Sequence, residues 1–314
     1  MSSERKAAAR SSAAAGAGSA LGPLVAVGAV TVLSGTPPLS KYIHVQGLAL
    51  AAHRFFWLAL VLGLVLGLRG GRITSGALRH GWRSGVLFAA NIALFYSAVK
   101  MTTVANATII GAVQPVLSLL VVGPLFGERV HRSDAAVTAV AIGGVVVVVY
   151  GSSITPVWSP RGDALALAAM LCWTGYLVVS RRARNELSAL ELQTVLTLVA
   201  GVLVAPVALA SGQSFAVPRG DIAWLVVLVL VPGVGHTLVN WCHAHTPMVL
   251  LSLLFLLNPV VATALAALFL DEPVNGYQIA GMVVVVASLA VVVVRLQRRG
   301  AAQVSEGEGR RAGG

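Results

Sequence analysis

The chain has 314 residues, of which 57% are hydrophobic and 11% are charged, and its formal net charge is +11. Ordinary soluble domains carry roughly 25% charged residues, so the composition excludes a soluble domain and indicates a protein of the lipid bilayer. The positive charge does not indicate nucleic-acid binding. Such binding needs basic residues concentrated on one folded face, whereas here they punctuate hydrophobic segments.

Residues 1–20 are Ala-, Ser- and Gly-rich without an apolar face, and are predicted to form a flexible cytoplasmic tail. Apolar runs of about twenty residues then alternate with short polar loops, which is typical of membrane-spanning helices. Pro37 and Pro38 must break or kink the first run. A polar, Gly-rich cytoplasmic tail, 296–314, follows the last. The ten predicted spans are 21–43, 47–68, 82–101, 103–126, 134–151, 163–182, 188–210, 222–243, 248–270 and 277–295.

The second half of the chain repeats the first. An offset of 144 positions places Pro259 on Pro115 without a gap. Each half, 21–151 and 161–295, contains five spans, and because five is odd the second repeat must enter the membrane upside down. The sequence therefore predicts an all-α membrane protein whose ten transmembrane helices form two inverted five-helix repeats.

The basic residues predict the orientation, since cytoplasmic loops carry an excess of Lys and Arg. With a cytoplasmic N-terminus, 17 of the 22 basic residues lie inside and only Arg161 and Arg219 lie in outer loops. We predict a multi-pass protein of the cytoplasmic membrane with both termini inside. The loop at 128–133 is then cytoplasmic and the loop at 271–276 is external.

Two long stretches resemble a known family. They are YSAVKMTTVANATIIGAVQPVLSLLVVGPLFGERV in the first half and GHTLVNWCHAHTPMVLLSLLFLLNPVVATALAALFLDEPV in the second. Both are similar to the drug/metabolite transporter superfamily, specifically its ten-helix branch with two EamA repeats. The resemblance covers residues 21–295 and implies membrane transport, with export the commoner direction.

Single positions also match this family or depart from it. Arg54 resembles the arginine near the start of the second helix, and Trp173 resembles the tryptophan of the sixth. Leu33-Ser34 occupy the places where the family usually has Trp-Gly, and Asn258 stands where Glu is frequent.

Pro115 and Pro259 lie near the centres of two spans, where each removes a helix hydrogen bond and frees a carbonyl. Prolines at matching positions of two repeats indicate a transporter's substrate site, and we consider both as hinge or gate positions. Gln114 and Asn258 stand beside them. Each amide can bind a polar solute or join two helices.

A polar stripe lies on the eighth span, where His236, Asn240 and His243 are spaced i, i+4, i+7. Polar groups on one face keep that face away from lipid. We expect His236 and Asn240 to bind substrate, with interhelical packing as the alternative, and His243 to be solvated at the helix end. Pro232-Gly233 interrupts the same span at its centre, which favours a kink or hinge.

Arg54 lies seven residues inside the second span, roughly 10 Å of helix rise from its end. A structural reading gives it Trp57, at i+3, as a cation–π partner. None of the spans carries a mid-membrane carboxylate to pair with it. We therefore expect Arg54 to bind a carboxylate or phosphate of the substrate.

Three aromatic residues complete the candidate substrate site: Tyr96, Trp173 and Tyr176. Each can line a cavity or belong to an interfacial belt. The histidines lack neighbouring Cys or Glu, so we predict no metal site, and no motif indicates a cofactor or a nucleotide-binding domain. The expected partners are a small-molecule substrate and the bilayer, with the protein a monomer or homodimer.

These features predict a secondary transporter, most consistent with an exporter, that moves a small polar organic metabolite by alternating access. The alternatives are a membrane-embedded enzyme that uses Arg54, His236 and Asn240, and a passive pore. Turnover into a new chemical species would identify the enzyme. Saturable exchange between two solutes would argue against the pore.

Overall fold

The computed structural model describes residues 21–102, 104–128, 131–151, 159–269 and 274–312, and the regular structure within them is helical. Nine helices of this described part are long and apolar enough to cross a membrane, and a shorter apolar helix covers Ile109–Leu125. Together they occupy the ten predicted spans, so the predicted fold class is confirmed.

The first half of the chain begins with a helix over residues 21–34. It is followed by α2 (Thr36–Tyr42), α3 (Gly47–Leu68), α4 (Ser75–Met101), α5 (Val104–Gly111), α6 (Gln114–Leu117), the π-helical turn η1 (Ser118–Val122), α7 (Gly123–Leu125) and α8 (Arg132–Gly151). α4 begins seven residues before the predicted span. The Thr74 hydroxyl caps it there by accepting a hydrogen bond from the Ala77 N–H.

The second half follows the same plan. It contains α9 (Pro160–Ala183), α10 (Ala189–Ala210), the 3₁₀ turn η2 (Arg219–Asp221), α11 (Ile222–His245), α12 (Met248–Leu254), α13 (Leu257–Phe269) and α14 (Gly276–Ala312). Where a tail was predicted from residue 296, α14 continues to Ala312. No proline follows Arg295 to stop it.

Prolines explain where the helices break. The first span turns at Gly35, and Pro37 lies in the first turn of α2, as predicted. The fourth span breaks at residues 112–113 and the ninth at residues 255–256. Both breaks directly precede the matched prolines, since a proline ring clashes with the carbonyl four residues earlier.

Pro232 differs from these prolines. It lies inside α11, which continues as one helix on both sides of it. Pro232 therefore does not end the helix, and the kink or hinge at Pro232-Gly233 stays a prediction. Gly233 instead provides room for α3, since a Cβ there would lie 2.5 Å from Leu58 Cδ1.

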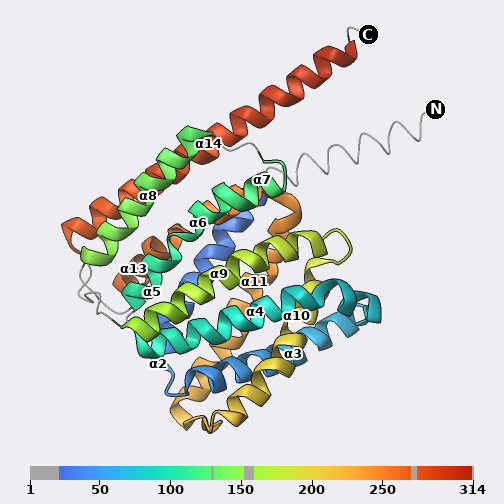
Figure 1. The fold of residues 1–314 in the computed structure, drawn as a ribbon, viewed down its shortest axis with the longest axis vertical. Helices are drawn as coiled ribbons and strands as arrows, with labels where there is room; N and C mark the ends of the chain where they lie inside the picture. The colour runs from blue at the N-terminus through green and yellow to red at the C-terminus, as the bar shows by residue number, and fades with distance from the viewer. Residues whose placement is uncertain (1–20, 103, 129–130, 152–158, 270–273, 313–314) are drawn as a thin grey trace.

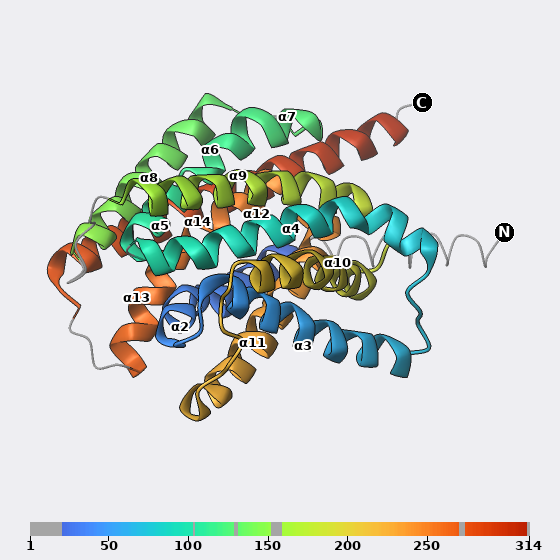
Figure 2. The ribbon, with the colours of Figure 1, turned by 60° about the horizontal axis from the view of Figure 1, so that its bottom comes forward.

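The two repeats pack against each other. α3 and α4 of the first repeat pack against α9 and α10 of the second, and α8 packs along α14 (Figures 1 and 2). α8 and α14 approach closely at Gly144 and Gly281, where a Cβ on Gly281 would lie 2.7 Å from the Gly144 carbonyl oxygen. Small residues at such crossings let transmembrane helices pack closely.

The outward surface is apolar. Leu68 is 79% exposed, Leu268 75% and Leu64 65%, and large apolar side chains on most other helices also point outward. Polar groups such as Arg54 and Asn240 are instead fully buried. This inside-out distribution suits a lipid environment, because water would penalise so large an apolar surface.

Candidate functional site

A cavity of about 200 Å³ lies between the two repeats. It reaches the helix breaks at both matched prolines, Pro115 and Pro259. The first repeat contributes four side chains with polar groups and the second contributes three. They are Thr36, Arg54, Asn91 and Gln114, and Trp173, His236 and Asn258. Most of the remaining lining is apolar.

Arg54 is fully buried at the edge of this cavity. Its Nη1 donates a hydrogen bond to the Tyr96 hydroxyl at 2.6 Å, and its Cζ lies 5.7 Å from the centre of the Tyr96 ring. Trp57, considered as a cation–π partner, is 48% exposed on the helix exterior. Tyr96 takes that role, because it approaches from α4 on the inward face. Nε and Nη2 of Arg54 have no hydrogen-bond partner among the described residues.

Gln114 and Asn258, the amides beside the matched prolines, each bind a serine of the other repeat. Gln114 Nε2 donates to Ser118 Oγ at 2.8 Å and to Ser252 Oγ at 3.4 Å. The Ser34 hydroxyl donates to Asn258 Oδ1 at 2.9 Å. Gln114 Oε1 is buried and has no hydrogen-bond partner in the part of the chain that the structure describes. The amides therefore join helices and also face the cavity.

Aromatic rings form one wall of the cavity. The Trp173 ring lies 5.2 Å from Phe255, 5.7 Å from His236 and 4.9 Å from Tyr176, measured between ring centroids. His236 Nδ1 is buried, and none of the described residues forms a hydrogen bond with it. This wall offers a flat apolar surface with one polar edge.

Asn240 lies outside the cavity lining. Its Oδ1 accepts a hydrogen bond from the Tyr176 hydroxyl at 2.8 Å, and its Nδ2 donates to Gln193 Oε1 at 2.7 Å. Tyr176 is likewise fully buried behind Trp173. The expectation that Asn240 and Arg54 face one cavity is therefore not met, because the bonds of Asn240 point toward α9 and α10.

The expectation that His243 is solvated at the end of its helix is wrong. It is 1% exposed, and the Tyr176 ring packs against it with 6.0 Å between the ring centroids. Sequence reasoning also missed Asn91, which lines the cavity and donates from Nδ2 to the Ala169 carbonyl at 2.8 Å. A lone amide within an apolar span was the available signal, for Asn91 and for Gln193 alike.

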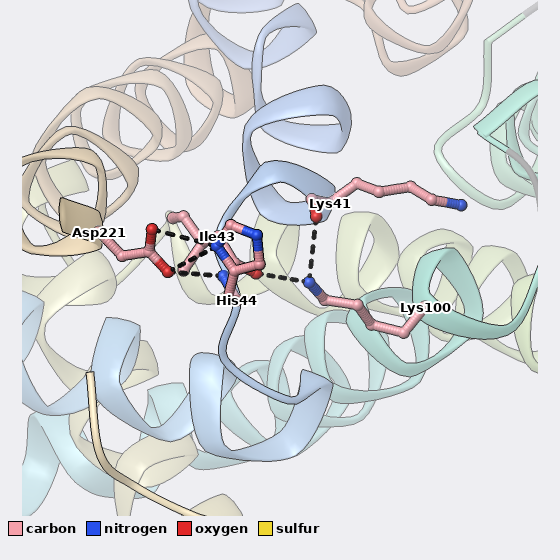
Figure 3. Close-up of polar contacts among 5 residues, drawn as sticks. All are labelled: Lys41, Ile43, His44, Lys100 and Asp221. Carbon is pink, nitrogen blue, oxygen red and sulfur yellow. Dashed lines mark hydrogen bonds and ion pairs between the residues drawn. The ribbon is translucent and has the colours of Figure 1, made fainter. Parts of the chain in front are cut away.

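One end of the bundle is tied at Thr102, the C-cap of α4. Lys41 Nζ donates to the Thr102 carbonyl at 2.9 Å. Nearby, Lys100 Nζ donates to the Ile43 carbonyl at 2.7 Å, and the His44 N–H donates to Asp221 at 2.7 Å (Figure 3). The chain between α2 and α3 is thus held between α4 and the start of α11.

The opposite end of the bundle is tied at Thr246, the C-cap of α11. It is the opposite end because α11 starts beside His44 and runs for 24 residues away from it. Arg181 Nη1 donates to the Thr246 carbonyl at 2.7 Å, and its Cζ lies 5.4 Å from the Phe126 ring centre. Glu128 accepts hydrogen bonds from the Met248 N–H at 2.6 Å and the Val249 N–H at 3.0 Å.

The two ends are related by the repeat. Thr102 and Thr246 are 144 positions apart, and each accepts from the basic residue at the end of its own repeat's first span, Lys41 or Arg181. Glu128 has its sequence counterpart at position 272, which lies outside the described residues. The bonds at Thr102 and Thr246 therefore lie at opposite ends, as inverted repeats require.

Inverted five-helix repeats, an apolar outer surface and a small cavity with a few polar groups at the repeat interface define a polytopic membrane carrier. The chain belongs to the EamA-like transporter family, whose profile matches residues 20–150 and 160–294. It is therefore a multi-pass membrane transporter.

Comparisons with individual proteins agree. The chain is 29% identical to Protein PecM of Dickeya dadantii (strain 3937) over 226 residues, covering 67% of this chain and 73% of PecM. It is 27% identical over 227 residues to a probable amino-acid metabolite efflux pump of Escherichia coli (strain K12), covering 68% and 76%. A solved crystal structure superposes with a TM-score of 0.73 at 22% identity, covering 90% of this chain and 98% of the other. That last likeness concerns the fold alone.

Proposed function

We propose that this protein is a secondary transporter that exports a small polar organic metabolite across the cytoplasmic membrane by alternating access. The observation that carries the proposal is the cavity at the repeat interface, which is lined by both matched proline–amide pairs and by a buried arginine. Discontinuous helices at matching positions are the usual place of a carrier's substrate site. The name of the Escherichia coli relative, an efflux pump, supports the direction.

The position of the cavity supports an inside-closed conformation. The basic residues favour cytoplasmic termini, which puts Thr246 at the inner end and Thr102 at the outer end. The cavity lies nearer the outer end, since Ala107 and Gly111 line it within eight residues of the start of α5. At the inner end, the hydrogen bonds of Glu128 and the contact of Arg181 with the Phe126 ring join the two repeats.

The candidate residues have different roles in this proposal. Arg54, Gln114, Trp173, His236 and Asn258 contact the substrate directly, since all five line the cavity. The remaining candidates act behind these five residues. Tyr96 orients Arg54, whereas Tyr176 and Asn240 support the aromatic wall. Pro115 and Pro259 serve as hinges, because the helix hydrogen bonds are already broken there. Pro232 and Gly233 add flexibility within α11.

Export is tested by untargeted measurement of solutes that accumulate outside cells overproducing the protein. We expect a small polar organic metabolite to accumulate relative to cells with an empty vector. The same solute should then show saturable uptake into vesicles that contain the purified protein. A flux that rises in proportion to concentration without saturating would identify a pore. Conversion of the solute into another species would identify an enzyme.

A further inference from the structure

We propose that a pocket at the Thr246 end of the bundle binds one molecule of phosphatidylethanolamine from the adjoining leaflet. Arg69 holds the lipid phosphate, and Glu191 accepts hydrogen bonds from the ammonium group, while an acyl chain follows the outer face of α11. This pocket has no lining residue in common with the cavity at the repeat interface. The lipid site is therefore separate from the proposed substrate site.

The pocket lies where three helices meet. Its volume is about 500 Å³, and its walls are the C-terminal end of α3, the first turn of α10 and the last turns of α11. These helices pack against one another (Figure 1). α3 starts beside the polar groups around His44 and has 22 residues. It is therefore about 33 Å long, whereas a hydrocarbon core is about 30 Å thick, so Arg69 lies at the level of the lipid headgroups.

Two opposite charges line the pocket without pairing. Arg69 and Glu191 are the formally charged residues of its described lining. They form no ion pair with each other in the described part of the chain. Glu191 Oε2 accepts a hydrogen bond from the Ser188 N–H at 2.8 Å, which fixes the carboxylate at the start of α10. A zwitterion compensates both charges, whereas an anion would leave the carboxylate facing a second negative charge.

The apolar side of the pocket continues a lipid-facing stripe of α11. Val227, Val231 and Val234 are 38%, 43% and 57% exposed. The same helical spacing continues through Leu238 to Trp241, and both of these residues line the pocket. An acyl chain on this stripe brings its own headgroup into the pocket, beside a tryptophan at interfacial depth. A soluble zwitterion would leave the stripe uncovered, so the structure favours a lipid.

Glu191 distinguishes ethanolamine from choline. A primary ammonium group carries three N–H donors for the carboxylate, whereas a quaternary ammonium group carries none. Quaternary ammonium groups are instead recognised by cages of aromatic faces. Trp241 is the one aromatic residue of the described lining, and the His245 ring stacks on it with 3.8 Å between the ring centroids. The pocket therefore suits the ethanolamine headgroup.

Three lipids with identical acyl chains test the headgroup: phosphatidylethanolamine, phosphatidylcholine and phosphatidylglycerol. Each is added to the purified, delipidated full-length protein, and native mass spectrometry measures the bound fraction. We expect one phosphatidylethanolamine molecule to bind with a Kd about fivefold lower than that of the other two lipids. Equal Kd values for all three would overturn the proposal.

Variants test the two charges. Glu191→Gln keeps the capping box, because Gln also serves at this position, and should bind phosphatidylethanolamine and phosphatidylglycerol with similar Kd. Arg69→Gln should weaken both lipids about fivefold, since each loses its phosphate contact. Glu186→Gln and Arg79→Gln are the matched controls, because both residues are exposed and lie outside the lining. Losses of the same size in the controls would reduce the effect to net charge and overturn the site.

A photo-reactive lipid tests the location without any variant. Phosphatidylethanolamine with a diazirine in one acyl chain should label α11 between residues 227 and 241, and excess phosphatidylethanolamine should suppress the labelling. Labelling spread evenly over the outer helices would overturn the site. None of these measurements uses transport. Failure of the lipid site therefore leaves the proposed function intact, and a lack of solute flux leaves the lipid site intact.

Discussion

Glu128→Gln should open the Thr246 end of the bundle. Glu128 reaches across from the first repeat and accepts the first two N–H groups of α12, which has no side-chain cap of its own. Gly127, with φ of 70°, makes the left-handed turn that positions Glu128 after α7. A carboxylate at a helix N-terminus satisfies orphan donors and also interacts favourably with the helix dipole.

The expected magnitude follows from these two bonds. Gln keeps one acceptor, loses the charge and places an NH₂ group against the other N–H. The loss of one charge-assisted hydrogen bond is worth about 1.5 kcal/mol for a half-buried group. Since about 1.4 kcal/mol corresponds to a tenfold change in an equilibrium constant, the open population should rise about tenfold.

Amide hydrogen exchange measures this opening where it occurs. We expect exchange at Met248 and Val249 to accelerate about tenfold in Glu128→Gln, with little change in α3 or α10. Glu186→Gln is the matched control, because Glu186 is an exposed acid in the nearby α9–α10 loop. Unchanged protection at Met248 and Val249 in Glu128→Gln would refute the closing role of Glu128.

Three further predictions concern topology, hinges and packing. In a variant without its native cysteines, Asn275→Cys should react with an impermeant reagent on intact cells, and labelling only after lysis would contradict the orientation. Pro115→Ala and Pro259→Ala should each slow transport several-fold with expression maintained, since a regained helix hydrogen bond of about 1 kcal/mol stiffens the break; normal transport by the double variant would exclude the hinge. Gly233→Ala should lower thermal stability by about 1–3 kcal/mol, because its Cβ would lie 2.5 Å from a leucine carbon of α3. Gly63→Ala, where a Cβ meets nothing within 4 Å, is the control and should be neutral or slightly stabilising.

The sequence was sufficient to predict the spans and the repeat. In lipid the backbone must pair its own hydrogen-bonding groups, which favours a helix. The length of an apolar run is therefore enough to predict elements such as α3, whose bounds, 47–68, were predicted without error. The matched prolines predicted discontinuous helices for a local reason, the missing N–H group. Pro232 shows the limit of this reasoning, because α11 tolerates it without a break.

The partners of the candidate residues could not be predicted in the same way. Trp57 was a reasonable partner for Arg54 at i+3, but the helix rotates it outward and Tyr96, 42 positions away, lies against the guanidinium. Likewise, the periodicity placed Asn240 on a polar stripe with His236. Only the packing of α11 against α9 and α10 determined that His236 faces the cavity and Asn240 faces Gln193.

The physical reason is the range of the interactions. Burial in lipid and hydrogen bonding within a helix depend on residues a few positions apart, so the ten spans, the inverted repeat and the candidate polar residues could be obtained from the sequence. The cavity and the bonds of Glu128 to α12 arise where helices from opposite repeats meet. Those contacts depend on helix rotation and crossing, which side-chain packing across the whole bundle decides.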